Sequence, residues 1–297
     1  MHGFLPRRWR DRNAGRLTGA LLITLFYLPA VQSYDEPLVT RVTASLAHDD
    51  NVANAALSRD RRDDVFLGLD TSLNRLLQPT LFWSLELEAA LRIREYNRYT
   101  RLGFVAPEVT GRASYRPAGG FLMPTFSGHL SAAWRDYRSQ ARDGALYRAG
   151  LQIRQPLTTR IDAHLRAEQT HRRADNRVFD YRFRSFGLSA DWRFASQTSL
   201  YIGIGRRQGD LVSTSRDYNS LKNAADAWIA DDAFPNAAAE QLAYRIDARA
   251  DQYSIGLNQA LSEQTRVGLL LQHQDASGGY STSYQRNLVM VTLVQQF

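Results

Sequence analysis

The sequence predicts an all-β fold, namely a single antiparallel, up-and-down barrel of about twelve strands that crosses a membrane. Three observations support this prediction. Apolar and polar residues alternate with a period of two in about a dozen segments, as in strands with one apolar face. After residue 33, no apolar run is long enough for a membrane helix. The connections alternate between longer, charged segments and short ones that often contain Pro or Gly, which is typical of transmembrane barrels.

The first 33 residues predict a cleavable secretory signal peptide. A basic region with five arginines between Arg7 and Arg16 precedes a short apolar run, Leu17 to Leu28, and a cut near Tyr34 would follow residues 31–33. The apolar run is too short to span a membrane as a helix. We therefore expect residues 34–297 to form one barrel domain.

Composition excludes several kinds of site. The chain has no Cys, so disulfides, zinc-thiolate sites and thiol nucleophiles are excluded. Of the net charge of +7, residues 1–33 contribute +4, and the weak excess that remains does not predict nucleic-acid binding. Lys222 is the only lysine, so the other basic residues are arginines. Codon bias in a GC-rich genome also produces such an excess, so composition alone does not separate bias from function.

Twelve alternating segments follow the signal peptide. In order, they cover Leu38–Ala47, Val65–Leu73, Leu81–Arg94, Val105–Tyr115, Leu122–Trp134, Tyr147–Arg154, Arg160–Glu168, Phe179–Trp192, Leu200–Ile204, Tyr244–Asp251, Val267–Leu271 and Asn287–Phe297. In the third segment, nearly every second residue from Leu81 to Ile93 is apolar, over more than ten residues. That length matches a tilted membrane crossing, whereas strands of globular sheets average about five or six residues.

Two places depart from simple alternation. The apolar face changes parity between Phe183 and Phe186, which predicts a β-bulge near Ser185. Residues 209–243 form the longest stretch without clear alternation, and we expect a long extracellular loop there. Within it, Leu221, Ala224, Ala225, Trp228 and Ile229 follow helical spacing, which predicts a short amphipathic helix.

The last segment ends on an aromatic residue, Phe297. A final apolar strand that stops on such a residue resembles the bacterial outer-membrane β-barrel proteins, whose last strand closes the barrel against the first. The resemblance implies an outer-membrane location, contact with outer-membrane lipid and both chain ends in the periplasm. It also implies recognition by the barrel-assembly machinery, with Phe297 as a barrel-closure signal. No cofactor is expected, and no metal, because the Asp49–Asp50 pair lacks further spaced oxygen ligands.

If the apolar faces contact lipid, the opposite residues line the lumen. The predicted pore-lining residues are mostly arginines: Arg92, Arg94, Arg148, Arg154, Arg160, Arg166, Arg182, Arg184, Arg245 and Arg249, with Glu86 and Glu88. A twelve-stranded barrel lies between small filled barrels and wide aqueous ones, so we expect a narrow, water-filled lumen. Arg stays charged and binds carboxylates, which favours anionic solutes. The chain thereby resembles small twelve-stranded porins for acidic oligosaccharides, whose lumens carry arginine ladders. It is predicted to be a porin-like channel.

Internal charge pairing is an alternative interpretation of the same residues. Opposite charges lie two residues apart in several strands, as at Arg160 and Asp162. Such residues neutralise one another when they pair. The alternative is therefore a non-conducting structural or export-associated barrel.

A second alternative is an enzyme. His129 and Ser131 resemble the His-x-Ser pair of the outer-membrane phospholipase, another twelve-stranded barrel, in which Ser is the nucleophile and His its base. Here the flanking motif is missing and the pair lies on the predicted lumen face, whereas that enzyme acts on lipid at the outer wall. We therefore expect no enzymatic activity.

Overall fold

The computed structural model describes residues 38–117, 120–216, 222–223, 225–235, 240–279 and 282–297. The predicted signal peptide, residues 1–33, lies outside these ranges. Within them, helices long and apolar enough to cross a membrane are absent.

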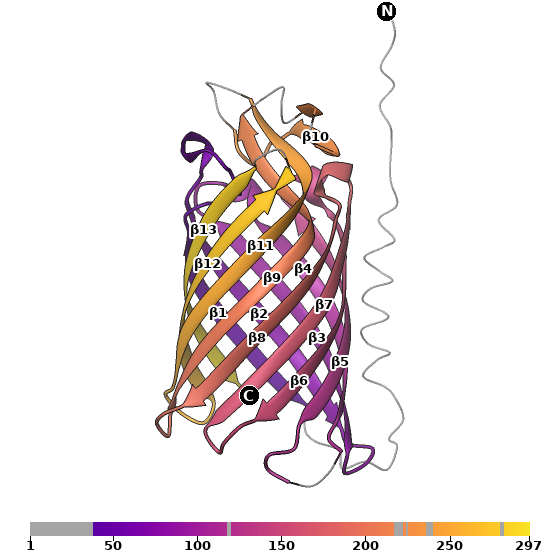
Figure 1. The fold of residues 1–297 in the computed structure, drawn as a ribbon, viewed down its shortest axis with the longest axis vertical. Coiled ribbons are helices and arrows are strands. Elements are labelled where there is room, and N and C mark those ends of the chain that lie inside the picture. The colour runs from indigo at the N-terminus through magenta and orange to yellow at the C-terminus, as the bar shows by residue number, and fades with distance from the viewer. Residues whose placement is uncertain (1–37, 118–119, 217–221, 224, 236–239, 280–281) are drawn as a thin grey trace, which may run out of the picture.

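The described strands form one antiparallel sheet. They are β1 (Val39–Asp49), β2 (Asp64–Leu77), β3 (Trp83–Tyr96), β4 (Phe104–Tyr115), β5 (Thr125–Tyr137), β6 (Gly144–Pro156), β7 (Ile161–Ala174), β8 (Tyr181–Arg193), β9 (Thr198–Arg216), β10 (Ala227–Ala230), β11 (Gln241–Ala260), β12 (Thr265–Gly278) and β13 (Ser283–Gln296). Each barrel strand pairs with the next in sequence, β9 pairs with β11, and β13 pairs with β1. Twelve strands therefore close a barrel, and β10 is an additional strand hydrogen-bonded to β11 (Figure 1).

The seam between β1 and β13 includes the last residue of the chain. The backbone nitrogen of Phe297 donates to the Thr40 carbonyl at 2.8 Å, and the Thr40 nitrogen donates to the Phe297 carbonyl at 3.2 Å. The final residue thus takes part in closing the barrel. Its role as a signal to the assembly machinery stays a prediction.

The two ends of the barrel carry different connections (Figure 1). One end, here called the turn end, has the links from β2 to β3, β6 to β7, β8 to β9 and β11 to β12, together with the C-terminus. The other, the loop end, has β10 and four short 3-10 helices: η1 (Ser58–Asp60), η2 (Thr100–Leu102), η3 (Gln140–Arg142) and η4 (Arg177–Phe179). The long-loop and short-turn asymmetry that the sequence predicted is therefore present.

The outer wall of the barrel is apolar. Leu130 and Leu151 are each 69% exposed there, and Phe186 is 57% exposed. On β3, Leu91 is exposed on this wall, whereas its neighbour Arg92 turns inward and meets Glu108. Exposed apolar faces with polar residues inside are the inverse of a water-soluble protein, and they match a barrel whose wall contacts lipid.

The predicted β-bulge near Ser185 is wrong. Residues of β8 pair one to one with β7 from Tyr181 through Trp192, without an extra residue. Phe183 faces the lumen, where the guanidinium of Arg207 lies 3.5 Å from its ring centre. The aromatic residues before Ser185 therefore belong to the inner face, and no change of parity is needed.

The segment predicted as an irregular loop, residues 209–243, contains more strand than expected. β9 continues to Arg216 and β11 begins at Gln241, and the two remain paired over this extension. Trp228 and Ile229 lie in β10, so the predicted helix is wrong at these positions. Leu221 and Ala224 lie outside the described residues. The strand pairs of β9, β10 and β11 satisfy the backbone hydrogen-bonding groups here. The helical spacing of a few apolar side chains is a weaker preference than this pairing.

Candidate functional site

The middle of the lumen wall is charge-paired around one buried carboxylate. Glu108 is 4% exposed. It accepts from Arg92 Nη2 at 3.0 Å, from Arg148 Nη2 and from Thr110 Oγ1 at 3.3 Å. Two guanidinium groups therefore share one acid, and each is held by a charge-assisted hydrogen bond.

Further pairs continue this pattern along the wall. Arg94 binds Asp70 through two hydrogen bonds of 3.1 and 2.9 Å. Toward the turn end, Arg154 Nη2 lies 3.0 Å from Asp162 Oδ2. We call these groups, together with those around Glu108, the paired wall. Since acids accompany the arginines along it, the positive charge of the paired wall is largely neutralised.

His129 and Ser131 face the lumen within the paired wall, as expected. His129 Nε2 lies 3.2 Å from Glu168 Oε2, and Ser131 Oγ accepts from Arg148 Nε at 3.0 Å. A Ser nucleophile needs its hydroxyl proton directed to a base. Here the hydroxyl accepts from an arginine and the imidazole contacts a glutamate, so the geometry lends no support to the hydrolase alternative.

A cavity of about 250 Å³ lies inside the loop end of the barrel. Five arginines line it, Arg135, Arg142, Arg172, Arg207 and Arg286, together with the aromatic residues Tyr96, Phe104, Tyr137, Phe179, Tyr181, Tyr284 and Phe234. We call this cavity the arginine chamber. It brings together residues of β3, β4, β5, β7, β8, β9, β12 and β13, which lie far apart in the sequence.

Two of the chamber arginines are paired with acids. Arg286 binds Asp49 through Nε, at 3.0 and 2.9 Å from its two carboxylate oxygens, and through Nη2. Arg142 Nη2 lies 2.6 Å from Asp231 Oδ2, and that aspartate side chain is fully buried.

The other three chamber arginines lie against aromatic rings. The guanidinium of Arg207 is 3.5 Å from the Phe183 ring centre, that of Arg135 is 5.2 Å from Phe104, and that of Arg172 is 4.9 Å from Tyr137. Among the described residues, no carboxylate lies within ion-pair distance of these three side chains. Cation–π contacts stabilise guanidinium groups by about 0.5–2 kcal/mol but do not cancel their charge. The chamber therefore carries a positive charge that the paired wall lacks.

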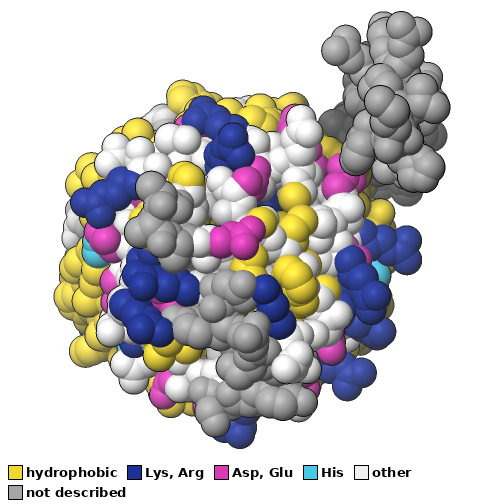
Figure 2. All heavy atoms as spheres, turned by 90° about the horizontal axis from the view of Figure 1, so that it is seen from above, with side chains coloured by type: hydrophobic (Ala, Val, Ile, Leu, Met, Phe, Trp, Pro, Cys, Tyr) yellow, Lys and Arg dark blue, Asp and Glu magenta, His cyan; other side chains and the backbone are white. Residues whose placement is uncertain are grey.

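Two segments cover the chamber on the loop side, and we call residues 51–55 and 231–234 the mouth cover. Ala53, Ala55, Ala233 and Phe234 pack into one buried apolar cluster with Leu102. Figure 2, viewed onto the loop end, shows hydrophobic and acidic side chains near the middle with basic groups around them. The two described segments of the cover are therefore held together by buried apolar contacts.

The first segment of the cover is fixed to β9, which lies four strands from β1 around the barrel. Thr214 donates its backbone N–H to the Ala53 carbonyl at 2.8 Å, and Asn54 Nδ2 donates to the Val212 carbonyl at 3.0 Å. Asn54 has a φ of 51°, in the left-handed region that Asn tolerates better than most residues. The loop after β1 therefore reaches across the mouth to β9.

The second segment of the cover is fixed by two aspartates. Asp231 accepts from Thr214 Oγ1 at 2.6 Å as well as from Arg142, and Asp232 accepts from Ser139 Oγ at 2.5 Å. Phe234 packs against Tyr99 with the two rings tilted by 55° and 4.9 Å between ring centres. Burial raises the pKa of the Tyr99 phenol above its ordinary value, so the ring stays neutral at this contact.

The structure separates the predicted pore-lining residues into three groups. Facing the lumen are Glu86, Glu88, Arg92, Arg94, Arg148, Arg154 and Arg166. Arg160 lies in the turn before β7, so its placement on the lumen wall is wrong. The placement of Arg182, Arg184, Arg245 and Arg249 is also wrong, because these four lie on the outer face.

The four outer arginines have two physical explanations. On β8, Arg182 and Arg184 share the parity of the exposed Phe186 because the strand has no bulge. On β11, the pattern inverts: Ala248 and Ala250 pack inside the barrel, and Arg249 points out. This part of β11 lies toward the loop end, where the outer face is polar and the interior is packed, so the apolar side turns inward.

Sequence reasoning missed Arg172, Arg207 and Arg286 as lumen residues. For Arg172 a signal existed, because it has the same parity as Arg166 on β7 and the strand extends to Ala174. Arg207 has the parity opposite to the outward Ile204 and is likewise found by counting in steps of two. Their association with aromatic rings from other strands had no local signal.

Comparison with solved structures supports the fold. An outer membrane channel from Pseudomonas putida F1 matches with a TM-score of 0.56 and 14% identity, covering 91% of this chain and 100% of that one. The KdgM porin matches at 0.41 with 9% identity over 86% and 99% of the two chains, and the NanC porin at 0.43 with 9% identity over 87% and 98%. The fold assignment rests on the first of these matches. No protein-family model and no curated protein matches the sequence.

The chain has the fold of bacterial outer-membrane barrels, and its wall fits the same location. Only helices and closed barrels satisfy their backbone hydrogen bonds in lipid, and this barrel is closed with an apolar exterior. The protein is therefore an outer-membrane β-barrel. From the loop asymmetry of such barrels we expect the turn end to face the periplasm and the loop end to face outside.

Proposed function

We propose that the protein is a porin-like channel that passes small anionic solutes and selects them in the arginine chamber. The observation that carries this proposal is the charge imbalance inside the chamber. Arg135, Arg172 and Arg207 rest against aromatic rings and have no carboxylate partner among the described residues. A cluster of cations with low-dielectric walls concentrates anions from solution.

The geometry of these arginines suits transient binding of an anion. The hydrogen bonds that these guanidinium groups make go to uncharged acceptors: Arg135 and Arg172 donate to the Tyr137 hydroxyl. Arg172 also donates to the Arg142 carbonyl, and Arg207 donates to the Asp210 carbonyl at 3.4 Å. The N–H donors that remain are open to a carboxylate or phosphate. Cation–π contact orients the group without a competing acid. A channel needs a site strong enough to admit a solute and weak enough to release it. Below the chamber, the paired wall offers alternating donors and acceptors rather than net positive charge.

The mouth cover favours a second candidate, a barrel that does not conduct. Buried contacts at Asp231 and Phe234 hold the cover over the chamber. Under the channel proposal, a solute enters from outside only when the cover moves, which requires these contacts to break. In a non-conducting barrel, the same contacts stay intact.

Planar bilayers separate the two candidates. We expect purified protein under a KCl gradient to give a reversal potential that shows a preference for chloride over potassium. The double variant Arg172→Met and Arg207→Met is expected to lose that preference, while Arg182→Met, which removes one arginine from the outer face, is expected to keep it. Silent bilayers with both the natural protein and an Asp231→Asn variant that loosens the cover would contradict the channel.

A further inference from the structure

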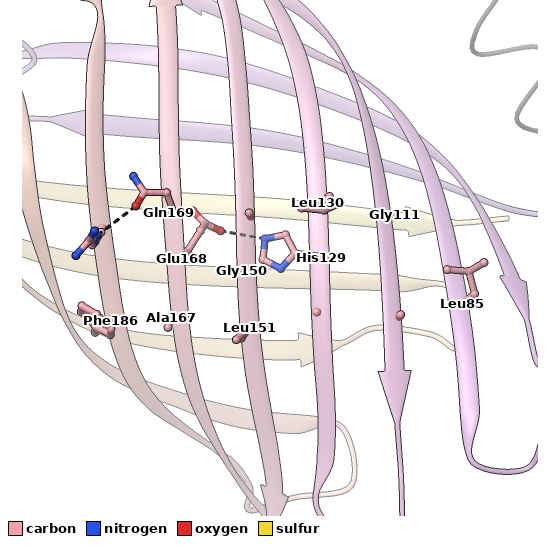
Figure 3. Close-up of a pocket in the computed structure, with 14 residues that line it drawn as sticks. Leu85, Gly111, His129, Leu130, Gly150, Leu151, Ala167, Glu168, Gln169 and Phe186 are labelled. Atoms are coloured by element: carbon pink, nitrogen blue, oxygen red, sulfur yellow. Dashed lines mark hydrogen bonds and ion pairs between the residues drawn. The ribbon is translucent and has the colours of Figure 1, made fainter.

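A groove of about 760 Å³ lies on the outer wall over β3 to β8 (Figure 3). Its floor consists of small outward-facing residues, among them Gly111, Ala113 and Ala149, and Leu130 and Leu151 stand at its sides. Both leucines are 69% exposed. The volume falls within the range of about 300–1,000 Å³ typical of ligand pockets.

The floor of the groove has free space above it. A Cβ atom added at Gly111 would meet only Leu87 Cδ2, at 3.9 Å. Because that is ordinary van der Waals contact, packing within the barrel does not require glycine here. A groove of this kind, inside an apolar wall, accepts a hydrocarbon chain from the surrounding membrane.

A cationic group lies at the side of the groove nearer the loop end. Arg184 and Gln169 line it there, and Arg184 Nε donates to Gln169 Oε1 at 3.3 Å. Arg184 is exposed and has no carboxylate partner among the described residues. On the neighbouring strand, by contrast, Arg206 Nε lies 2.7 Å from Asp251 Oδ1. The remaining donors of Arg184 are therefore available to an anion beside the groove.

We infer that the groove binds a phosphorylated glycolipid of the outer leaflet, with an acyl chain that runs from Gly111 over Gly128 to Ala149, between Leu130 and Leu151, and a phosphate at Arg184. The assignment rests on charge complementarity: an apolar slot ends at an unpaired guanidinium, and Arg binds phosphate through two parallel hydrogen bonds. The cation lies toward the loop end, which faces the outside, so the lipid comes from the outer leaflet. The site depends on the membrane location and not on channel function.

Native mass spectrometry of the full-length protein in detergent tests the site. The probe is purified lipid A carrying its phosphates, and dephosphorylated lipid A is the comparison. We expect one retained molecule of the phosphorylated lipid on the natural protein and about tenfold less on Arg184→Gln, the cost of one charge-assisted hydrogen-bonding group. Gly111→Leu, which fills the groove, is expected to reduce retention to a similar extent.

Two matched controls keep the test specific. Arg182→Gln removes an arginine from the same outer face. Arg182 lies two residues nearer the loop end than Arg184 and does not line the groove. Ala44→Leu enlarges an exposed residue of β1, on a different part of the barrel. Both are expected to retain the lipid as the natural protein does. Equal retention by all variants, or retention that is indifferent to the phosphates, would overturn the assignment, whatever the bilayer recordings show.

Discussion

The paired wall and the arginine chamber differ in how they hold their arginines. In the paired wall, Arg92 and Arg148 share the buried Glu108. In the chamber, Arg172 and Arg207 rest against Tyr137 and Phe183. The first arrangement removes net charge and ties strands together, whereas the second keeps the charge, because these two arginines donate only to uncharged oxygen atoms. One residue type therefore serves stability in one region and solute attraction in the other, according to the neighbour that each strand supplies.

The largest expected effect is on stability, in the paired wall. Glu108→Gln leaves two partly buried guanidinium groups without their acid, and we expect a loss of about 3 kcal/mol in the free energy of unfolding. Urea unfolding in detergent micelles measures it. The control is Thr110→Val, which removes one hydrogen bond from an uncharged hydroxyl to the same carboxylate and is expected to cost about 1 kcal/mol. Equal effects of the two substitutions would mean that the wall is not organised by charge pairing.

The mouth cover gives the next largest effect. Asp231→Asn weakens the contact with Arg142 and leaves that arginine inside the chamber without a charged partner, so we expect the cover to loosen by about 2 kcal/mol. Limited proteolysis of the loop end then becomes faster. The neighbouring Asp232→Asn breaks the more exposed pair with Arg101, and it is expected to change the proteolysis rate far less.

The chamber arginines are expected to respond in the opposite way to Glu108. Arg207→Met replaces a cation without an acid by an apolar chain of similar length that still packs on Phe183, so stability changes by less than about 1 kcal/mol or increases. Anion preference in bilayers is nevertheless expected to fall. A stability loss as large as that of Glu108→Gln would remove the distinction between the two regions.

The smallest effect on stability is expected at an exposed ion pair of the loop end. Arg98 and Asp63 form an ion pair of 3.0 Å with both side chains more than half exposed. Exposed pairs contribute little, so Asp63→Asn is expected to change the free energy of unfolding by less than about 0.5 kcal/mol. The same unfolding measurement, repeated at high salt, is expected to show no further difference between the two proteins.

Where strands cross the lipid-facing part of the wall, local patterning was enough to assign each side chain to a face. On β3 and β7, two-residue alternation placed Leu91 outside and Arg92 and Arg166 inside, because only the outer face is apolar there. The rule failed on β11, where Arg249 and Ala248 exchange faces. Toward the loop end the exterior is polar and the interior is packed, so the same alternation has the opposite meaning.

The sequence by itself determined the fold class, the approximate strand number, the asymmetry of the connections and the closure at Phe297, because these follow from periodicity and turn composition along the chain. Only the tertiary structure decided which arginines meet acids and which meet aromatic rings. Arg207 and Phe183 lie on different strands, and Arg142 and Asp231 lie in different connections of the loop end, so each contact depends on how the barrel and its cover bring these segments together. The net charge in each part of the lumen therefore depends on which side chains surround the arginines, and not on the number of arginines alone.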